Sequence, residues 1–200
     1  MTDKNQFLQK VSELFYEQGA KSLTMDDIAK EFSMSKKTLY QQYTKKEELI
    51  AEVLQFILDE MVKNLQIDQI EDVNPIANMF CREQNMQEFS KSNRTLFIRQ
   101  LQKYYPNLFE NHLVEMDKKI STIIVGNIEK GRKLNLYRKD FDAAFYSKLL
   151  LHLFISVESS ILFEGENSDK QREEEKNEIM KFFLNSIATE KGTEILKNYN

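Results

Sequence analysis

Turn-forming residues are scarce in this chain, and this scarcity limits the possible folds more than any other feature. Its 200 residues include only 5 Gly and 2 Pro. A β-sandwich needs a turn signal about every 8 to 12 residues, which this composition does not supply. Hydrophobic residues make up 41% of the chain, enough to form a substantial core. We therefore expect an ordered, all-α fold.

Apolar residues at intervals of three and four predict four helices in the first third of the chain. The first helix is expected to end at Gly19, a residue type that favours helix C-termini. Thr24 and Ser35 are positioned to cap two short helices. Thr44 and Glu47 have the spacing of a capping box, and a long amphipathic helix follows them.

The same spacing predicts further helices in the remainder of the chain. Asn74-Pro75 is expected to open a helix through about Phe89, because proline is favoured at the first helical position. Asp142 is a candidate cap for another helix, with Phe141 and Tyr146 placed as a hydrophobic staple. Two helices are expected over 94–104 and 106–130, and Gly131 is expected to end the second of them. The helix that begins after Asp142 is expected to end near Phe163. A mobile loop over 164–173 and a last long helix are expected to follow it.

Charge is distributed unevenly along the chain. The net charge of −4 alone argues mildly against a nucleic-acid partner. Residues 35–46, however, contain four lysines and no acidic residue. This segment can therefore bind phosphate, although a solvated lysine-rich face would have the same composition.

Residues 24–46 have the pattern of a helix-turn-helix. Two short helices are joined by the brief turn 32–35, and Ala29 is small where the second helix must cross closely. Ile28, Phe32, Met34 and Leu39 can form the miniature core between the helices. The other side chains of the second helix then face outward: Lys36, Lys37, Thr38, Gln41 and Gln42. Lysine contacts phosphates or guanine edges, glutamine pairs with adenine, and the threonine methyl meets a thymine methyl.

At these residues the chain resembles the TetR family of repressors. The resemblance is carried by residues 23–30, Leu-Thr-Met-Asp-Asp-Ile-Ala-Lys, and 35–49, Ser-Lys-Lys-Thr-Leu-Tyr-Gln-Gln-Tyr-Thr-Lys-Lys-Glu-Glu-Leu. It implies that Tyr40 and Tyr43 brace or contact the phosphate backbone, and that Lys46 binds a phosphate at a helix N-terminus. Both tyrosines could also be core residues. The full predicted DNA-binding set is Thr24, Ser35, Lys36, Lys37, Thr38, Tyr40, Gln41, Gln42, Tyr43 and Lys46.

Ser33 departs from the family pattern, which usually has glycine at this point of the turn. The turn tends to need a left-handed backbone, which costs a serine about 1 kcal/mol if the geometry is kept. The distal stretches 104–108, 131–137 and 182–192 resemble the family only loosely.

The resemblance further implies an effector cavity between the distal helices, suited to a mostly hydrophobic small molecule. Plain helical core explains the same apolar residues without a ligand. The candidate ligand-binding residues are Phe80, Phe97, Leu101, Tyr104, His112, Met116, Ile120, Phe145 and His152.

A homodimer is expected because one short recognition helix contacts too few base pairs for useful specificity. The helices that begin at Asp142 and near Glu173 resemble the pair that forms the family's dimer interface. Intramolecular packing is the alternative use of their apolar faces. The candidate interface residues are Leu150, Leu153, Val157, Ile179, Phe182, Phe183 and Ser186.

Other function classes lack support in the sequence. Cys81, the only cysteine, is expected to be a small buried hydrophobe, and we find no zinc-site spacing, signal peptide or membrane span. We find neither a Gly-rich phosphate loop nor a nucleophile with a base, so we expect no enzyme, cofactor or metal. A ligand-independent architectural DNA-binding protein remains an alternative, as does activation instead of repression.

The sequence therefore predicts a cytoplasmic, ligand-responsive repressor with two domains. Residues 1–46 form a three-helix helix-turn-helix domain that binds double-stranded operator DNA. Residues 47–200 form a helical domain that binds a small-molecule effector and dimerises.

Overall fold

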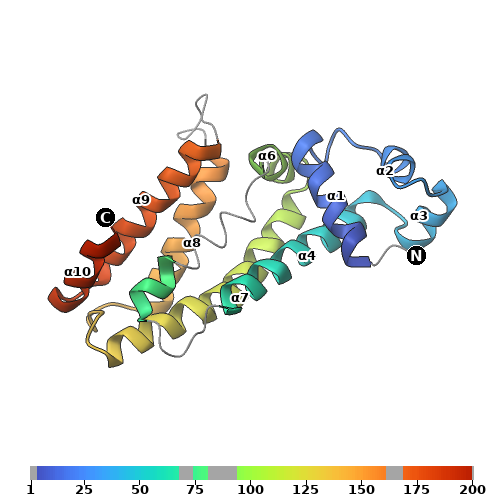
Figure 1. Cartoon of the computed structure of the whole chain (residues 1–200). Helices are drawn as coiled ribbons and strands as arrows, with labels where there is room; N and C mark the ends of the chain where they lie inside the picture. The colour runs from blue at the N-terminus through green and yellow to red at the C-terminus, as the bar shows by residue number, and fades with distance from the viewer. Residues whose placement is uncertain (1–3, 68–73, 81–93, 161–168, 200) are drawn as a thin grey trace. The chain divides into compact units, whose positions relative to one another are not determined.

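The structure, a computed structural model, describes residues 4–67, 74–80, 94–160 and 169–199. They are helical nearly throughout (Figure 1), as the composition predicts. The chain forms two compact units. Unit 1 comprises residues 1–60 with 92–114, and unit 2 comprises 61–91 with 115–200. The predicted functional boundary after residue 46 is a different division and stays a prediction.

Unit 1 contains the four helices expected in the first third of the chain. They are α1 (Lys4–Gln18), α2 (Met25–Glu31), α3 (Lys36–Gln42) and the start of α4 (Lys46–Ile67). The apolar face of α1 is buried, and the helix stops before Gly19, whose φ of 79° is the left-handed conformation expected at a helix end. Leu39, Leu49, Ile50 and Val53 join this core from α3 and α4.

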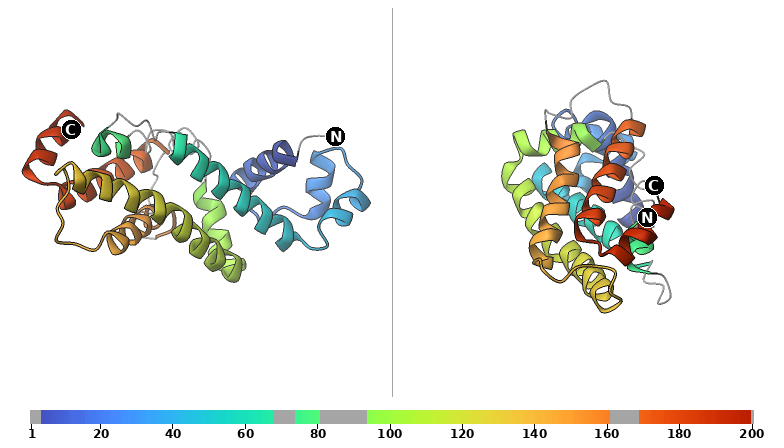
Figure 2. Two further views of the ribbon diagram at one scale, coloured as in Figure 1. Left: turned by 90° about the horizontal axis from the view of Figure 1, so that it is seen from below. Right: turned by 90° about the vertical axis from the view of Figure 1, so that its left-hand side faces the viewer.

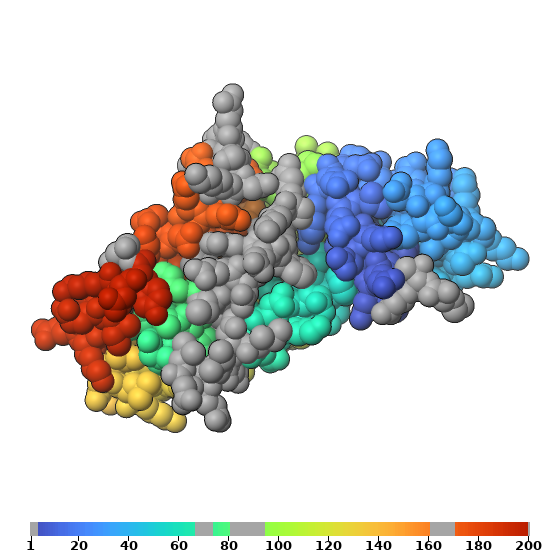
Figure 3. Space-filling model, viewed as in Figure 1, coloured from blue at the N-terminus to red at the C-terminus, as the bar shows by residue number. Residues whose placement is uncertain are grey.

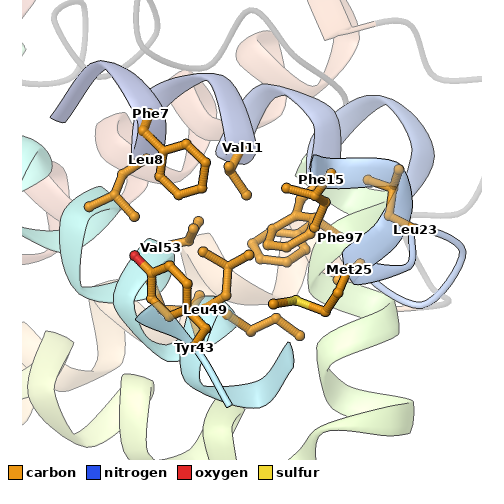
Figure 4. Close-up of a cluster of buried hydrophobic side chains, with 14 of the residues drawn as sticks. Phe7, Leu8, Val11, Phe15, Leu23, Met25, Tyr43, Leu49, Val53 and Phe97 are labelled. Carbon is orange, nitrogen blue, oxygen red and sulfur yellow. The ribbon is translucent and has the colours of Figure 1, made fainter. Parts of the chain in front are cut away.

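The helix α6 (Arg94–Tyr104) completes the core of unit 1. Figure 4 shows Phe97 beside Phe15 within the cluster of buried side chains. Their rings are stacked with centroids 5.4 Å apart, and the Tyr16 ring meets Phe97 edge-on at 5.7 Å. The core of unit 1 therefore includes a helix that lies well beyond the N-terminal helices in the sequence.

Unit 2 contains the helical residues 75–80, most of α7 (Pro106–Lys133), α8 (Ala143–Ser159), α9 (Asp169–Ile187), α10 (Glu190–Leu196) and a short 3-10 helix, η2 (Lys197–Tyr199). α8 and α9 lie side by side in Figures 1 and 2. The Lys176 ammonium and the Glu158 carboxylate form a largely buried ion pair between these two helices. An antiparallel β-bridge between Tyr137 and Ala188 joins the loop before α8 to the residue that follows α9.

Several predicted helix starts are confirmed. Asn74 caps the helix that begins at Pro75, since its side-chain oxygen accepts from the Ala77 N–H at 2.9 Å. Asp142 caps α8 through the Phe145 N–H at 2.8 Å. The predicted staple is also present, with the Phe141 and Tyr146 rings 4.4 Å apart. These starts were predictable because a cap involves only residues close together in the sequence.

Gly131 does not end its helix, contrary to the sequence-based expectation. α7 continues to Lys133, and the left-handed residue that follows is Asn135, with a φ of 57°. Gly131 is required for a different reason. A Cβ at this position would lie 2.0 Å from the Tyr137 ring, so only glycine allows that ring to pack against the helix.

Three other expected boundaries are wrong. α8 ends at Ser159, not near Phe163, because Ser160 already has extended backbone; residues 161–163 lie outside the described part. α9 begins at Asp169, so at least residues 169–173 of the expected loop are helical. Four of these five residues, Lys170, Gln171, Arg172 and Glu173, are polar types that also have high helix propensity, which explains the error. The capping carboxylate at Thr44 is Glu48, with both bonds 2.8 Å, since α4 begins only at Lys46.

α10 was not expected from the sequence. Thr189 caps it, and its hydroxyl also lies 2.8 Å from the Asn135 carbonyl oxygen in the loop after α7. This helix therefore depends on a contact between distant parts of the chain. The predicted continuation of the 75–80 helix to Phe89, and the buried position of Cys81, lie outside the described residues.

Candidate nucleic-acid interface

The turn between α2 and α3 has the geometry that the helix-turn-helix pattern predicts. Ser33 has a φ of 51°, so this serine adopts the left-handed conformation for which glycine is usual. The Ser33 N–H donates to the Lys30 carbonyl at 3.0 Å, and the Met34 N–H to the Ala29 carbonyl at 2.9 Å. The turn therefore keeps its hydrogen bonds and accepts the backbone cost of serine.

Side-chain caps hold both short helices. The Thr24 hydroxyl accepts from the Asp27 N–H, and the Asp27 carboxylate accepts from the Thr24 N–H and hydroxyl. These bonds from Thr24 hold the pKa of Asp27 below its usual value. Ser35 accepts from the Thr38 N–H at 3.1 Å, and their two hydroxyls lie 2.7 Å apart. Thr24 and Ser35, both in the predicted DNA-binding set, thus form the starts of α2 and α3.

The predicted miniature core is confirmed, and so is the outward face of α3. Ile28 and Leu39 are completely buried, with Phe32 and Met34 packed against the core. The surface of α2 and α3 is light blue in Figure 3. Every residue that the sequence places on the outer face of α3 is exposed: Lys36, Lys37, Thr38, Gln41 and Gln42.

The lysines of this face are not equivalent. The Lys36 ammonium forms an ion pair with the Asp26 carboxylate of α2. Hydrogen bonding to Asp26 raises the pKa of Lys36 above its usual value. The sequence analysis did not single out Asp26, because ten residues separate it from Lys36. Only the crossing of α2 and α3 brings the two charges together.

Tyr40 and Tyr43 have different surroundings. Tyr40 is 45% exposed, so its ring is open to a ligand. Tyr43 packs in the core of unit 1, and its hydroxyl donates to the Glu52 carboxylate, which also pairs with Lys4. Burial, followed by the bond to Glu52, raises the pKa of Tyr43. Its ring therefore braces α3 against α4.

Lys46 is half-buried at the start of α4. Its ammonium donates to the Leu23 carbonyl, just before the cap of α2. Burial lowers the pKa of Lys46, and the nearby positive charge of Lys21 lowers it further. An ammonium has three N–H donors, so two remain that can donate hydrogen bonds to a phosphate. The side chain thus links the starts of α2 and α4.

Four of the predicted effector residues lie in unit 1. Phe97 and Leu101 are buried in its core. Tyr104 is 44% exposed, and the ammonium groups of Lys21 and Lys103 lie 5.2 and 5.3 Å from its ring centroid. His112 is half-buried, and burial lowers its pKa to about 4.

The other five predicted effector residues belong to unit 2 and differ in their burial. Phe80 stacks on Tyr199 with ring centroids 4.8 Å apart. Met116 and Ile120 are buried, whereas Phe145 and His152 are exposed on α8. The whole predicted set therefore includes core positions as well as surface positions.

The predicted dimer residues are likewise of two kinds. Leu150, Val157 and Phe183 are at most 2% exposed within a single chain, so they offer little surface to a partner. Phe182 is 67% exposed. Leu153, Ile179 and Ser186 are half-buried. Phe145 and Leu149, which the dimer prediction did not include, add exposed apolar area on α8.

The described residues also bear on two other kinds of site, a membrane span and a metal centre. Among them, no helix has the length and apolar character required to cross a membrane. No cluster of three or more His, Cys, Asp or Glu side chains there could hold a metal ion.

Comparison with known proteins gives a family for the N-terminal helices. Residues 8–53 match the family model of bacterial regulatory proteins, tetR family. A sequence search of curated proteins finds no significant match.

Several solved structures share the fold. A TetR transcription regulator from Haloarcula marismortui aligns with a TM-score of 0.77 and 17% identity, over 94% of this chain and 100% of its own. A transcriptional regulator from Cytophaga hutchinsonii aligns at 0.74 and 17%, over 92% and 97%. A ketosteroid transcriptional regulator of Mycobacterium tuberculosis aligns at 0.64 and 17%, over 95% and 97%.

Proposed function

The N-terminal helices of this chain belong to the tetR family of bacterial regulatory proteins, which are DNA-binding transcriptional regulators, and from this premise we propose a ligand-released repressor. Residues 1–46 bind a palindromic operator, and residues 47–200 bind a small, mostly hydrophobic effector and dimerise. The protein acts in the cytoplasm, where its DNA partner is accessible.

The exposed face of α3 is the observation that carries this proposal. Lys37, Gln41 and Gln42 are exposed on a short helix that is anchored by Leu39 and Tyr43. A recognition helix needs this combination, because its outward side chains read base edges only if the helix is held rigidly. Tyr40 and Lys46 supply contacts to phosphates, which set the orientation on the duplex.

A dimer supplies the second recognition helix. The proposed interface is the surface of α8 and α9 where Phe145, Leu149 and Phe182 are exposed. Exposed aromatic and aliphatic side chains on neighbouring helices favour burial against a second copy. Two recognition helices about 34–36 Å apart would then meet successive major grooves on one face of the DNA.

Effector binding is proposed to disfavour the DNA-bound arrangement of the dimer. α4 begins at Lys46, in the proposed DNA-binding surface, and continues past Glu60 into unit 2. A tilt of this helix could therefore change the spacing of the recognition helices. A complete switch needs an effector that binds the released state more tightly by about 5.5 kcal/mol.

The test is selection of bound sequences from a random DNA pool with the purified protein, followed by a salt titration on the selected duplex. We expect a palindrome with half-sites about one helical turn apart. Recovery of no preferred sequence, with binding lost at moderate salt, would contradict the operator proposal and favour an architectural role.

Two variants separate phosphate binding from base reading. We expect Lys46→Ala to weaken binding to all sequences. It should also make the salt slope, the slope of log affinity against log salt concentration, less steep by about 2 for a dimer, one phosphate per subunit. Gln42→Ala should instead change the base preference of the selected sites. An unchanged slope for Lys46→Ala would show that Lys46 does not anchor a phosphate.

A further inference from the structure

The two adjacent acids at the start of α2 have different partners. Asp27 accepts hydrogen bonds from the Thr24 N–H and hydroxyl, which completes the capping box. Asp26 takes no part in that box, and its carboxylate pairs with the Lys36 ammonium. One acid therefore completes the N-terminal cap of α2, while its neighbour pairs with a residue of α3.

Lys36 is the first residue of α3, after the cap Ser35. In a helix-turn-helix the N-terminal residues of the second helix are the ones that approach base edges. The exposed fractions of the Lys36 and Asp26 side chains are 67% and 47%, so the pair lies at the surface that would face DNA. Pairs this exposed contribute little to folding stability. Their effect on DNA binding is then the more important consequence.

We propose that Asp26 is a specificity-determining residue that restrains Lys36 and so limits sequence-independent binding to DNA. A free lysine at this position would neutralise a phosphate on any duplex, because phosphate contacts carry no sequence information. With its charge already paired, Lys36 gains less from random DNA. The relative contribution of Gln41, Gln42 and Thr38 to recognition then increases. The inference rests on the proposed function and adds a means of discrimination to it.

The experiment compares wild type with Asp26→Asn on the selected operator and on a scrambled duplex, over a range of salt concentrations. We expect the variant to bind scrambled DNA more tightly, by on the order of 3- to 10-fold at 0.1 M salt, with a slope steeper by about 2 per dimer. Operator affinity should rise less, so the ratio of operator to scrambled affinity falls. Asp26→Glu, which keeps the charge, should restore the wild-type slope.

Glu31→Gln is the matched control, because it removes one exposed acid from the other end of the same helix. A second control repeats Asp26→Asn in a Lys36→Gln background, where any action through Lys36 must vanish. Thermal unfolding of each variant should match wild type closely, since the pair is exposed.

The outcomes separate the two proposals. If wild type binds no duplex, the proposed function fails, and this inference fails with it. If wild type binds its operator but Asp26→Asn leaves the scrambled-DNA affinity and slope unchanged, only the inference is overturned. An equal gain from Glu31→Gln, or an equal gain without Lys36, would also overturn it, because the acid would then act by general repulsion of phosphates.

Discussion

At the scale of single residues, the same amino acid has different physical roles at different positions. Gly131 and Gly126 both lie inside α7, but only Gly131 is in tight contact with a side chain. A Cβ at Gly131 would lie 2.0 Å from the Tyr137 ring, whereas one at Gly126 would meet nothing within 4 Å. The sequence offers no means to distinguish these two positions.

We expect Gly131→Ala to destabilise the protein by about 1–3 kcal/mol, because the Tyr137 ring must move from a packed position. Gly126→Ala is the matched control. It should stabilise the protein by about 0.5–1 kcal/mol, since alanine favours a helix interior and gains no clash. Urea unfolding measures both changes. A stabilised Gly131→Ala variant would show that the ring does not pack against the helix backbone as described.

The two histidines differ in the same way. His112 is half-buried and has its pKa lowered to about 4, whereas His152 is exposed. The unfolded chain binds a proton at His112 near its ordinary pKa of 6.5, before the folded chain does. Burial of neutral His112 therefore costs stability progressively as the pH falls from about 6.5 to 4.

We expect His112→Gln to lose less stability than wild type over this pH window, by an amount on the order of 2 kcal/mol. Chemical denaturation at a series of pH values measures the difference between the two proteins. Parallel curves for wild type and His112→Gln would mean that His112 is not buried in its neutral form.

At the scale of helices, α6 has a role that its place in the sequence does not suggest. It was predicted to supply effector contacts, but Phe97 and Leu101 pack in the core of unit 1. The same helix holds the turn after α1. Gln100 accepts from the Lys21 N–H, and its side chain occupies the space where a Cβ at Gly19 would lie. α6 thus supports the helices that present the proposed interface.

We expect Phe97→Ala to destabilise the protein by about 3–5 kcal/mol, because a buried aromatic ring is replaced by a cavity. DNA binding should weaken in parallel, from partial unfolding of unit 1. Tyr104→Ala, an exposed aromatic on the same helix, should cost about 1 kcal/mol or less. Thermal unfolding and duplex binding test both variants. A stable Phe97→Ala variant that had lost only its response to an effector would instead support the predicted ligand contact.

At the scale of the whole molecule, the proposed dimer depends on apolar side chains that one chain leaves exposed. We expect Phe182→Glu to produce a monomer, since a charge at this position must be desolvated at the interface. Operator binding should fall steeply, because one recognition helix makes too few contacts. Light scattering after size-exclusion chromatography measures the mass.

Val114→Glu is the control for this change, because Val114 is 53% exposed on α7 and is not part of the proposed dimer interface. It should leave the oligomeric state as in wild type. A Phe182→Glu variant that remained dimeric would place the interface on another surface of the protein.

Sequence and tertiary structure thus determined different parts of this protein. Helical spacing and nearby caps predicted the helix-turn-helix and the starts at Thr24, Ser35 and Asp142. These features depend on residues within about four positions of one another, so the sequence specifies them directly. The pairing of Lys36 with Asp26, the burial of Phe97 and the need for Gly131 depend on partners brought together by folding. Only the tertiary structure decides them, because helical periodicity specifies which side of a helix is apolar but not which neighbour covers it.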